Sequence, residues 1–260
     1  MIFLTLIIAI AGKGGVGKST FSSLLIKNIT ENKDGVILAV DADSNSTLGQ
    51  MLGVRTDQTI GNLREDLLKE ADNVPPGMSK FEFVQYQLRL AMAEGDKFDL
   101  ITMGRPEGPG CYCYINNILR TFLDALSDKY SYVVIDNEAG MEHLSRRTTR
   151  AMDKFFIVTD YTPIGFETAE RIRDLSADLD LNIKEVYLII NRVPNGGKNP
   201  MEHPKIKELN ESQKYSGIFS IPNDETLIDH AFAGKPVLEL PDDSVAAKAV
   251  AGIAKKASVV

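Results

Sequence analysis

The sequence predicts an α/β protein with a single-domain, doubly wound and mostly parallel sheet, and three observations support this prediction. Short apolar runs recur along the 260 residues, helical spacing fills the stretches between them, and several runs are continuous rather than alternating. Continuous apolar runs are typical of strands that are covered on both faces. Alternation of such strands with helices favours parallel pairing through right-handed crossovers.

The expected elements follow in chain order. We expect strands over residues 2–11, 36–41, 98–103, 132–136, 155–159, 186–191 and 218–221. We expect helices over residues 18–32, 79–93, 114–127, 163–181 and 242–257. In each helical stretch, apolar residues recur at a spacing that places them on one face. Residues 194–200 indicate a surface loop rather than a linker, because another strand pattern follows. We therefore expect one domain over residues 1–260.

Charge and cysteine content narrow the class of protein. The formal net charge is −7, which disfavours nucleic-acid and membrane-surface binding because both partners are anionic. Two cysteines do not make a disulfide framework, and they favour a reducing compartment. The apolar start lacks the basic region and cleavage site of a signal peptide, and it is too short to cross a bilayer. We expect a cytoplasmic protein with no nucleic-acid partner and no stable membrane association.

A glycine-rich motif follows the first expected strand. Residues 12–19 match G-x-x-x-x-G-K-[ST] between an apolar strand and a helical stretch. Glycines let backbone N–H groups surround phosphate oxygens at a helix N-terminus. The motif predicts a P-loop NTPase that binds ATP or ADP, with Lys18 on the β- and γ-phosphates and the Ser19 hydroxyl on Mg²⁺. The expected phosphate-binding residues are Gly12, Lys13, Gly14, Gly15, Val16, Gly17, Lys18, Ser19 and Thr20.

Lys13 and Lys18 are two lysines in one phosphate loop, and this arrangement resembles that of a known class of ATPases. Residues 13–19 resemble the deviant Walker A loop of the nitrogenase iron protein, the septum-site MinD ATPases and the ParA partition ATPases. In this class ATP is sandwiched between two subunits, so the resemblance implies a homodimer. It also implies that Lys13 reaches across the dimer to the other subunit's phosphates, where a second cation stabilises charge during phosphoryl transfer. A solvated loop lysine is the alternative for Lys13.

Carboxylates end two of the expected strands. Asp41 and Asp43 follow the second strand on the ligand side of such sheets. The resemblance implies that Asp43 orients the attacking water and that Asp41 supports the Mg²⁺ shell, while the alternative is a cap on the helix near Thr47. Asp136 ends an apolar strand in the Walker B pattern, which predicts a Mg²⁺ ligand, direct or through water. The resemblance places Gly140 in switch II, where its N–H senses the γ-phosphate.

The last two expected strands end in polar residues. These residues are Asn191 and Arg192 after one strand, and Pro222 and Asn223 after the next. In the resembling class, residues at these positions contact adenine, so the same role is implied here. Asn191 offers both a donor and an acceptor, which suits the N6/N7 edge of adenine.

Segment 104–114 contains both cysteines, Cys111 and Cys113. The pair is too close for an easy disulfide, and the following helix N-terminus favours thiolates, which bind Zn²⁺, Ni²⁺ or an iron–sulfur cluster. One pair supplies two ligands, whereas a homodimer supplies the four of a closed tetrahedral site. Two incidental small residues in a loop are the alternative. The histidines favour surface or interface positions over metal ligation: His143, His203 and His230.

The cysteine pair and residues 140–146 together resemble the CooC-type ATPases. Those proteins assist nickel insertion into carbon monoxide dehydrogenase, and close relatives serve acetyl-CoA synthase. The resemblance covers essentially the whole chain and implies a metallochaperone with a client nickel enzyme. A positioning ATPase would need a basic amphipathic helix or basic surface. An iron–sulfur redox ATPase is a further alternative, although the nitrogenase iron protein carries its cysteines at two distant positions, which this chain lacks.

Overall fold

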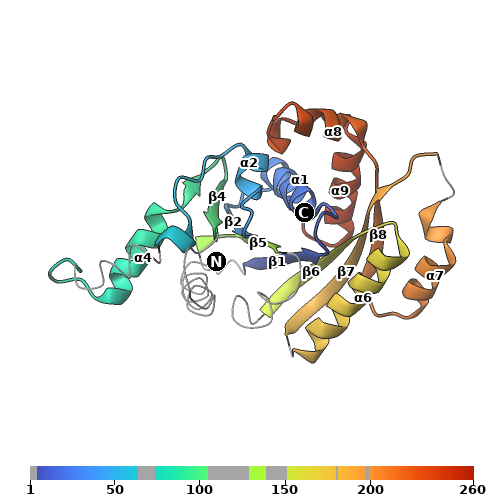
Figure 1. Ribbon diagram of the computed structural model, residues 1–260, viewed down its shortest axis with the longest axis horizontal. Coiled ribbons are helices and arrows are strands. Elements are labelled where there is room, and N and C mark those ends of the chain that lie inside the picture. The colour runs from blue at the N-terminus through green and yellow to red at the C-terminus, as the bar shows by residue number, and fades with distance from the viewer. Residues whose placement is uncertain (1–4, 64–73, 105–128, 139–150, 180, 197–198) are drawn as a thin grey trace.

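The computed structural model describes residues 5–63, 74–104, 129–138, 151–179, 181–196 and 199–260. Within these residues one sheet runs through the molecule and helices lie on both of its faces (Figure 1). No helix in these ranges is both long and apolar enough to cross a membrane. The expected α/β fold with a mostly parallel sheet is confirmed.

Every expected strand has a counterpart in the sheet. The strands are β1 (Leu6–Gly12), β2 (Ile37–Ala42), β3 (Ala93–Glu94), β4 (Phe98–Thr102), β5 (Tyr132–Asn137), β6 (Ala151–Asp160), β7 (Asn182–Val193) and β8 (Gly217–Pro222). Only β3 was not expected, because two residues carry no recognisable pattern. Strands β6 and β7 begin earlier than their apolar runs, since Lys154 on β6 pairs with Glu185 on β7, and Lys184 pairs with Asp153.

The strands lie in the order β3-β4-β2-β5-β1-β6-β7-β8. All neighbours are parallel except β3 and β4. Parallel strands present their carboxyl ends at one edge of the sheet, and ligands bind there in open α/β folds. The predicted phosphate loop, the carboxylates and the adenine-side residues all follow carboxyl ends, so the topology brings them to the same edge.

The helices agree with the sequence where their patterns are long. The described helices are α1 (Lys18–Asn32), α2 (Leu48–Leu52), α4 (Lys80–Leu90), α6 (Pro163–Asp178), α7 (Pro204–Glu211), α8 (Glu225–Phe232) and α9 (Val245–Lys256), with 3₁₀ turns η2 (Pro200–Glu202) and η3 (Val237–Glu239). Helix α1 has its expected bounds, whereas α4, α6 and α9 are shorter than expected. The expected helix over 114–127 lies outside the described residues. The short helices α2, α7 and α8 were not expected.

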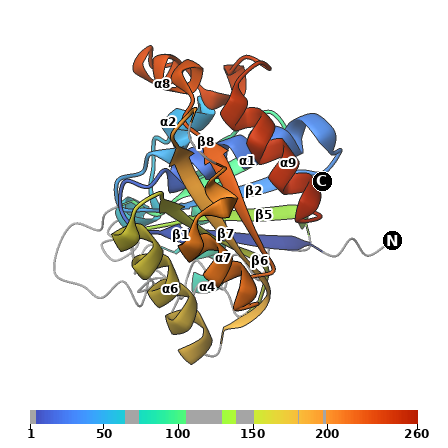
Figure 2. The ribbon, with the colours of Figure 1, turned by 90° about the vertical axis from the view of Figure 1, so that its right-hand side faces the viewer.

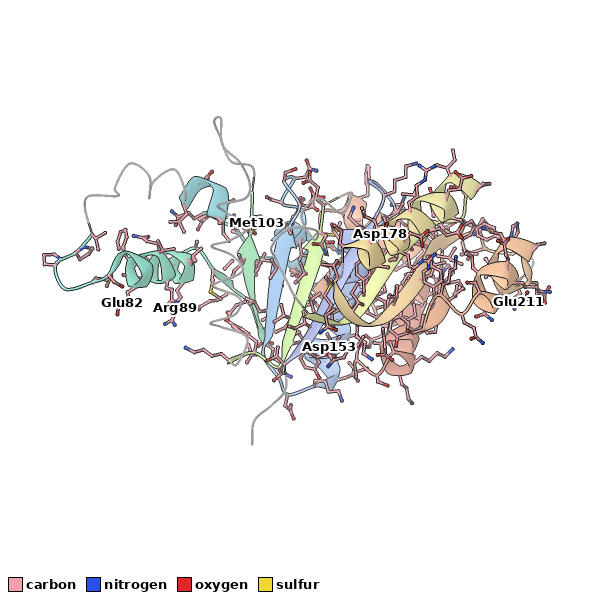
Figure 3. All side chains as sticks on the ribbon, turned by 90° about the horizontal axis from the view of Figure 1, so that it is seen from below. Glu82, Arg89, Met103, Asp153, Asp178 and Glu211 are labelled. Atoms are coloured by element: carbon pink, nitrogen blue, oxygen red, sulfur yellow. The ribbon has the colours of Figure 1, made fainter. Side chains whose placement is uncertain are left out.

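Two hydrophobic layers sandwich the sheet. Helices α1 and α9 cover one face and α6 covers the other (Figures 1 and 2). Ile8 and Ile10 of β1 pack with Phe21 of α1, whereas Ala9 packs in the opposite layer with Phe166 of α6. This alternation follows from the two-residue period of a strand. Figure 3 shows α4, marked by Glu82 and Arg89, at one end of the molecule and Glu211 of α7 at the other.

Candidate nucleotide and magnesium site

The phosphate loop leaves β1 at Gly12 and enters α1 at Lys18. Gly15 and Gly17 have φ angles of 81° and 96°, in the left-handed region that favours glycine. A Cβ on Gly12 would lie 2.2 Å from the Val158 carbonyl oxygen, so this close approach also requires glycine. Gly17 is the N-cap of α1 and has no side chain with which to occupy the first-turn N–H groups. Those groups therefore suit an anion at the helix N-terminus.

The two lysines of the loop differ in exposure. Lys18 is buried, with 6% of its surface exposed, and its Nζ lies 3.5 Å from the Lys13 carbonyl oxygen. Lys13 itself is exposed at the rim of the loop. An inward Lys18 fits phosphate binding within one chain. The exposed Lys13 fits contact with a second chain, and that role stays a prediction.

Asp136 is a buried carboxylate with one unsatisfied oxygen. Its Oδ1 accepts a hydrogen bond of 3.1 Å from the Ser22 hydroxyl, while Oδ2 is buried with no hydrogen-bond partner among the described residues. Burial raises the pKa of Asp136 to about 6, although Ser19, Lys18 and Ser22 act to lower it. A buried oxygen without a donor is the kind of atom that a bound cation satisfies.

Asp41 lies opposite Asp136 in the register of β2 and β5. Its Oδ1 accepts the Asp43 N–H at 3.1 Å, and its Oδ2 accepts the Leu48 N–H at 2.9 Å, at the start of α2. Burial, with the nearby charge of Asp136 as a smaller cause, raises the pKa of Asp41 to about 7, although the hydrogen bonds from the Leu48 and Asp43 N–H groups act to lower it. Asp41 therefore has the helix-capping contact that was the alternative interpretation, and its support of the Mg²⁺ shell stays a prediction.

The loop of residues 43–47 lies between these carboxylates and the phosphate loop. Oδ1 of Asp43 accepts hydrogen bonds from the backbone N–H and the side-chain Nδ2 of Asn45, both at 2.9 Å. Thr47 Oγ1 donates to Ser19 Oγ at 3.3 Å. The structure thus brings Asp43 to the same edge as Ser19, as its predicted role in orienting water requires.

These oxygen donors fit Mg²⁺. Ser19, Asp136 and Asp41 supply hydroxyl and carboxylate oxygens, which Mg²⁺ prefers, directly or through water. A magnesium ion held there would neutralise phosphate charge during phosphoryl transfer. Lys18 and the loop N–H groups would hold the phosphates themselves. Gly140, the predicted γ-phosphate sensor, lies outside the described residues.

The predicted nickel or zinc ligands, Cys111 and Cys113, also lie outside the described residues, as does His143. Across the described ranges, no group of three or more histidine, cysteine, aspartate or glutamate residues could hold a metal ion. His203 Nδ1 accepts the Lys205 N–H at 3.2 Å and begins α7, and His230 contacts a backbone carbonyl. His203 is exposed and His230 is half-buried, and both make contacts with the backbone.

A cleft of about 300 Å³ adjoins the phosphate loop. The predicted adenine-side residues Asn191, Arg192, Pro222 and Asn223 all line it, together with Thr20. Its apolar walls suit the faces of a flat base. The apolar lining comes from Phe21, Leu24, Met51, Leu227, Ile228, Val237 and Ala246. The structure thus brings together, at the ends of β7 and β8, four residues that the sequence assigned to one ligand.

Asn191 also fastens the phosphate loop to β7. Its Nδ2 donates a hydrogen bond of 2.8 Å to the Val16 carbonyl, and its Oδ1 accepts the Arg192 N–H at 2.9 Å. Arg192 Nη1 donates to the Gly15 carbonyl at 3.0 Å. Both polar groups of the Asn191 amide are engaged with backbone here, so its contact with adenine stays a prediction.

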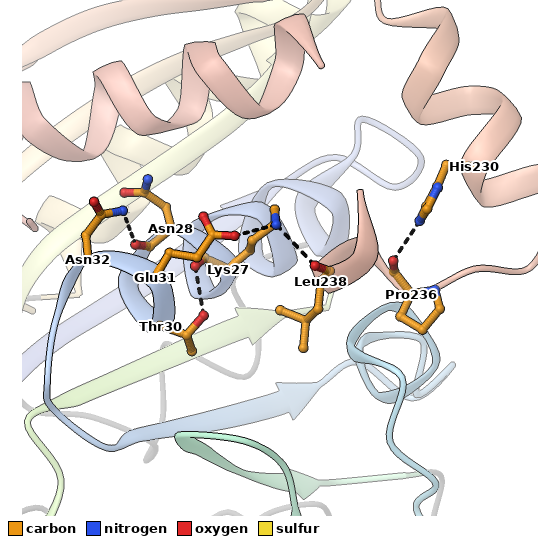
Figure 4. Close-up of polar contacts among 8 residues, drawn as sticks. All are labelled: Lys27, Asn28, Thr30, Glu31, Asn32, His230, Pro236 and Leu238. Carbon is orange, nitrogen blue, oxygen red and sulfur yellow. Dashed lines mark hydrogen bonds and ion pairs between the residues drawn. The ribbon is translucent and has the colours of Figure 1, made fainter. Parts of the chain in front are cut away.

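A side chain of α1 forms a hydrogen bond with the segment that makes one wall of the cleft (Figure 4). Lys27 Nζ donates to the Leu238 carbonyl at 3.1 Å and pairs with Glu31. His230 Nε2 lies 2.8 Å from the Pro236 carbonyl, which accepts its N–H. Val237, between these two anchors, lines the cleft. Helix α1 therefore carries the phosphate loop at its start and holds the cleft wall from its middle.

Several residues with contacts at this site were not predicted from the sequence. Ser22, Lys27 and Gln50 lie in helices, and Ser44 and Glu138 lie in loops. A polar residue such as Ser22, one turn after Lys18, is a usable signal because it faces the same side of α1 as the phosphate-loop lysine. The loop residues carry no such pattern.

The comparison with known proteins agrees with this geometry. The CobQ/CobB/MinD/ParA nucleotide binding domain matches residues 7–237, which is most of the chain. The chain belongs to the CobQ/CobB/MinD/ParA family. An uncharacterized ATP-binding protein of Methanocaldococcus jannaschii is 40% identical over 253 residues, covering 96% of this chain and 98% of its own length.

One further relative and one solved structure are also similar to this chain. The carbon monoxide dehydrogenase accessory protein CooC of Rhodospirillum rubrum is 28% identical over 231 residues, covering 85% of this chain and 84% of its own length. The structure of a ParA family ATPase from Chlorobium tepidum matches with a TM-score of 0.71 and 19% identity, covering 96% of this chain and 98% of that one. The chain thus carries the nucleotide binding domain of the CobQ/CobB/MinD/ParA family in the fold of a ParA family ATPase structure, with CooC as a distant homologue.

Proposed function

We propose that the chain is an ATP-hydrolysing metallochaperone that assists nickel insertion into carbon monoxide dehydrogenase or acetyl-CoA synthase. It would dimerise around ATP and around a metal ion held by Cys111 and Cys113 of both subunits. The observation that carries this proposal is the Cys-x-Cys pair in a chain of the MinD/ParA-like class. The similarity to an accessory protein of carbon monoxide dehydrogenase supports the same client class.

The start of segment 104–114 supports coupling between nucleotide and metal. This segment follows β4, and the Met103 N–H donates a hydrogen bond of 2.8 Å to the Asp41 carbonyl. The chain therefore leaves the sheet beside a residue of the predicted Mg²⁺ site. Cys111 is eight positions beyond Met103 in the sequence.

The proposed cycle uses the residues of the site in sequence. Lys18 and Ser19 bind the phosphates and Mg²⁺, Asp43 orients the attacking water, and Lys13 contacts the nucleotide of the other subunit. Closure of the dimer brings four thiolates around one metal ion. Hydrolysis or ADP release then loosens the dimer and frees the ion for the client. Such coupling requires different metal affinities in the two nucleotide states.

Equilibrium titration with Ni²⁺ or Zn²⁺ tests the proposal. The protein is titrated with ADP, with a non-hydrolysable ATP analogue and Mg²⁺, and without nucleotide. We expect the tightest binding, at one metal ion per two chains, with the ATP analogue. Equal affinity and stoichiometry in all three states would defeat the proposal.

Two variants assign the metal ligands. Cys111→Ser is expected to lose tight metal binding, because a hydroxyl replaces one thiolate in each subunit. The control is His203→Asn, which removes a surface imidazole but keeps an acceptor at the start of α7. The control is expected to bind metal as the wild type does. Unchanged binding by Cys111→Ser would show that the thiolate site is wrong.

A ParA/MinD-type positioning ATPase is the second candidate, and the family and fold favour it equally. Against it, Ala246, Val250 and Ile253 of α9 are buried in the layer that α9 shares with α1. This apolar face is therefore occupied by the core rather than presented to a bilayer. Co-sedimentation with anionic vesicles in the presence of ATP would favour positioning, whereas its absence favours the metallochaperone.

An iron–sulfur redox ATPase is distinguished by colour. A protein that carries a cluster absorbs visible light when it is purified without oxygen. A colourless anaerobic preparation that still binds nickel or zinc would support the metallochaperone.

A further inference from the structure

Ser44 and Glu138 join two loops that leave the sheet at the nucleotide edge. The Ser44 hydroxyl donates a hydrogen bond of 2.9 Å to Oε1 of Glu138. Both residues are half-buried. A hydrogen bond to a carboxylate is among the stronger side-chain contacts, because the acceptor is charged. The contact spans 94 positions of sequence and belongs to neither the phosphate loop nor the predicted Mg²⁺ ligands.

The sheet register explains why these two residues meet. Strands β2 and β5 are parallel neighbours, and Ala42 is paired with Asn137 at the end of their ladder. Ser44 and Glu138 follow just past this last pair. Their hydrogen bond therefore continues the contact between the segments that follow β2 and β5, beyond the last backbone pair of these strands.

The loop of residues 43–47 has few other anchors among the described residues. Asp43 accepts from Asn45, and the Ser46 N–H donates to the Asp43 carbonyl, so these contacts are local to the loop. The Asp43 N–H and the Thr47 hydroxyl tie its two ends to Asp41 and Ser19. Ser44 supplies the side-chain contact from this loop to the residues after β5.

We propose that Glu138 is a positioning residue for ATP hydrolysis, acting through Ser44 on Asp43. The Ser44–Glu138 bond holds the loop against the end of β5, and this fixes the backbone next to Asp43. Asp43 is the predicted water-orienting residue, and Gly140, the predicted γ-phosphate sensor, is two residues beyond Glu138. The bond therefore links the segment that senses the γ-phosphate to the segment that places the water. This inference rests on ATP hydrolysis in the proposed function and not on its metal step.

The expected kinetic effect falls on the chemical step. Neither residue lines the nucleotide cleft, so the KM for ATP is expected to stay within about twofold in Ser44→Ala and Glu138→Ala. Misplacement of a water-orienting group lowers the rate of chemistry, and we expect kcat to fall by about tenfold or more. A residue that only stabilised the fold would not produce this split between kcat and KM.

Conservative variants and a double variant sharpen the test. Ser44→Thr keeps the hydroxyl and Glu138→Gln keeps an acceptor oxygen, so each is expected to retain most of the wild-type kcat. Ser44→Ala combined with Glu138→Ala is expected to be no slower than Glu138→Ala alone, because both changes remove one shared interaction. The control is Glu211→Gln at the far end of the molecule, which is expected to match the wild type (Figure 3). Independent, multiplying losses of kcat would overturn the proposal.

Amide hydrogen exchange gives a readout that needs no turnover. In the nucleotide-free protein, the Ser46 amide is expected to exchange faster in Ser44→Ala than in the wild type, and at the wild-type rate in Ser44→Thr. An unchanged rate in Ser44→Ala would overturn the inference. The predicted loss of kcat in Ser44→Ala and Glu138→Ala, together with absent metal coupling, would instead overturn only the metal half of the proposed function.

Discussion

The Ser22 hydroxyl binds one oxygen of Asp136, and the other oxygen is buried with no hydrogen-bond partner in the described part of the chain. Without a cation, this arrangement costs folding free energy, because burial disfavours the charged form of the carboxylate. The raised pKa of Asp136, about 6, expresses the same cost. A cation bound at this second oxygen would offset that cost.

Asp136→Asn is expected to stabilise the free protein while abolishing Mg²⁺-dependent ATP hydrolysis. Between the unfolded pKa of 3.8 and the folded pKa of about 6, the folded state holds the proton more tightly. The contribution of Asp136 to the free energy of unfolding therefore falls as pH rises through this window. Urea unfolding near neutral pH without Mg²⁺ should show a gain of about 1 kcal/mol in the variant. A variant less stable than the wild type under these conditions would contradict the account.

Binding of Mg²⁺-ATP is expected to weaken as pH falls. Asp41 and Asp136 have pKa values raised to about 7 and about 6, so protons compete with the cation for the site in this range. We expect the affinity for Mg²⁺-ATP to drop by about tenfold between pH 8 and pH 6. Calorimetric titration at both pH values measures it, and ATP binding without Mg²⁺ is the control. Equal drops with and without Mg²⁺ would remove these carboxylates as the cause.

Asn191→Ala is expected to weaken nucleotide binding by about tenfold, because the Val16 carbonyl loses its tie to β7 and the phosphate loop loosens. Fluorescent-nucleotide titration provides the measurement. The matched control is Asn32→Ala, which removes an exposed amide bonded to its own helix. Nucleotide affinity that is the same in both variants would show that Asn191 does not organise the loop.

Lys27→Met is expected to lower the free energy of unfolding by about 1.5–3 kcal/mol, since a buried ammonium that holds the Leu238 carbonyl is lost. Glu31→Gln removes only the half-exposed partner of the same lysine and is expected to cost less than about 1 kcal/mol. Urea denaturation of the two variants compares them directly. A larger loss in Glu31→Gln would mean that the ion pair, and not the tether to the cleft wall, stabilises this region.

The sequence predicted those parts of the site that depend on local patterns. The phosphate loop, α1 and the Walker B strand each combine a short motif with a continuous apolar or helical pattern, and the structure has all of them. The tie from Asn191 to Val16 joins positions 175 residues apart, and no local pattern indicates it. Contacts between residues that are far apart in the sequence can be predicted only when the order and register of the strands are known.

Helices α2 and α8 were not predicted because they also depend on contacts between residues outside a local pattern. Helix α2 is five residues long and begins where Asp41 accepts the Leu48 N–H. Helix α8 is capped by Asp224, whose carboxylate also accepts the Ser244 hydroxyl and the Ala246 N–H at the start of α9. A buried carboxylate at its N-terminus fixes each of these two helices, and helices this short are marginal by themselves.

The mass of the protein in solution tests whether two copies associate around shared nucleotide and a thiolate-bound metal ion. Light scattering is measured with a non-hydrolysable ATP analogue, Mg²⁺ and Ni²⁺ at saturation, and again for Lys13→Ala and Cys111→Ser. We predict twice the chain mass of 28.6 kDa for the wild type, with weaker dimers in both variants. A wild-type mass that stays at one chain under saturating ligands would contradict it.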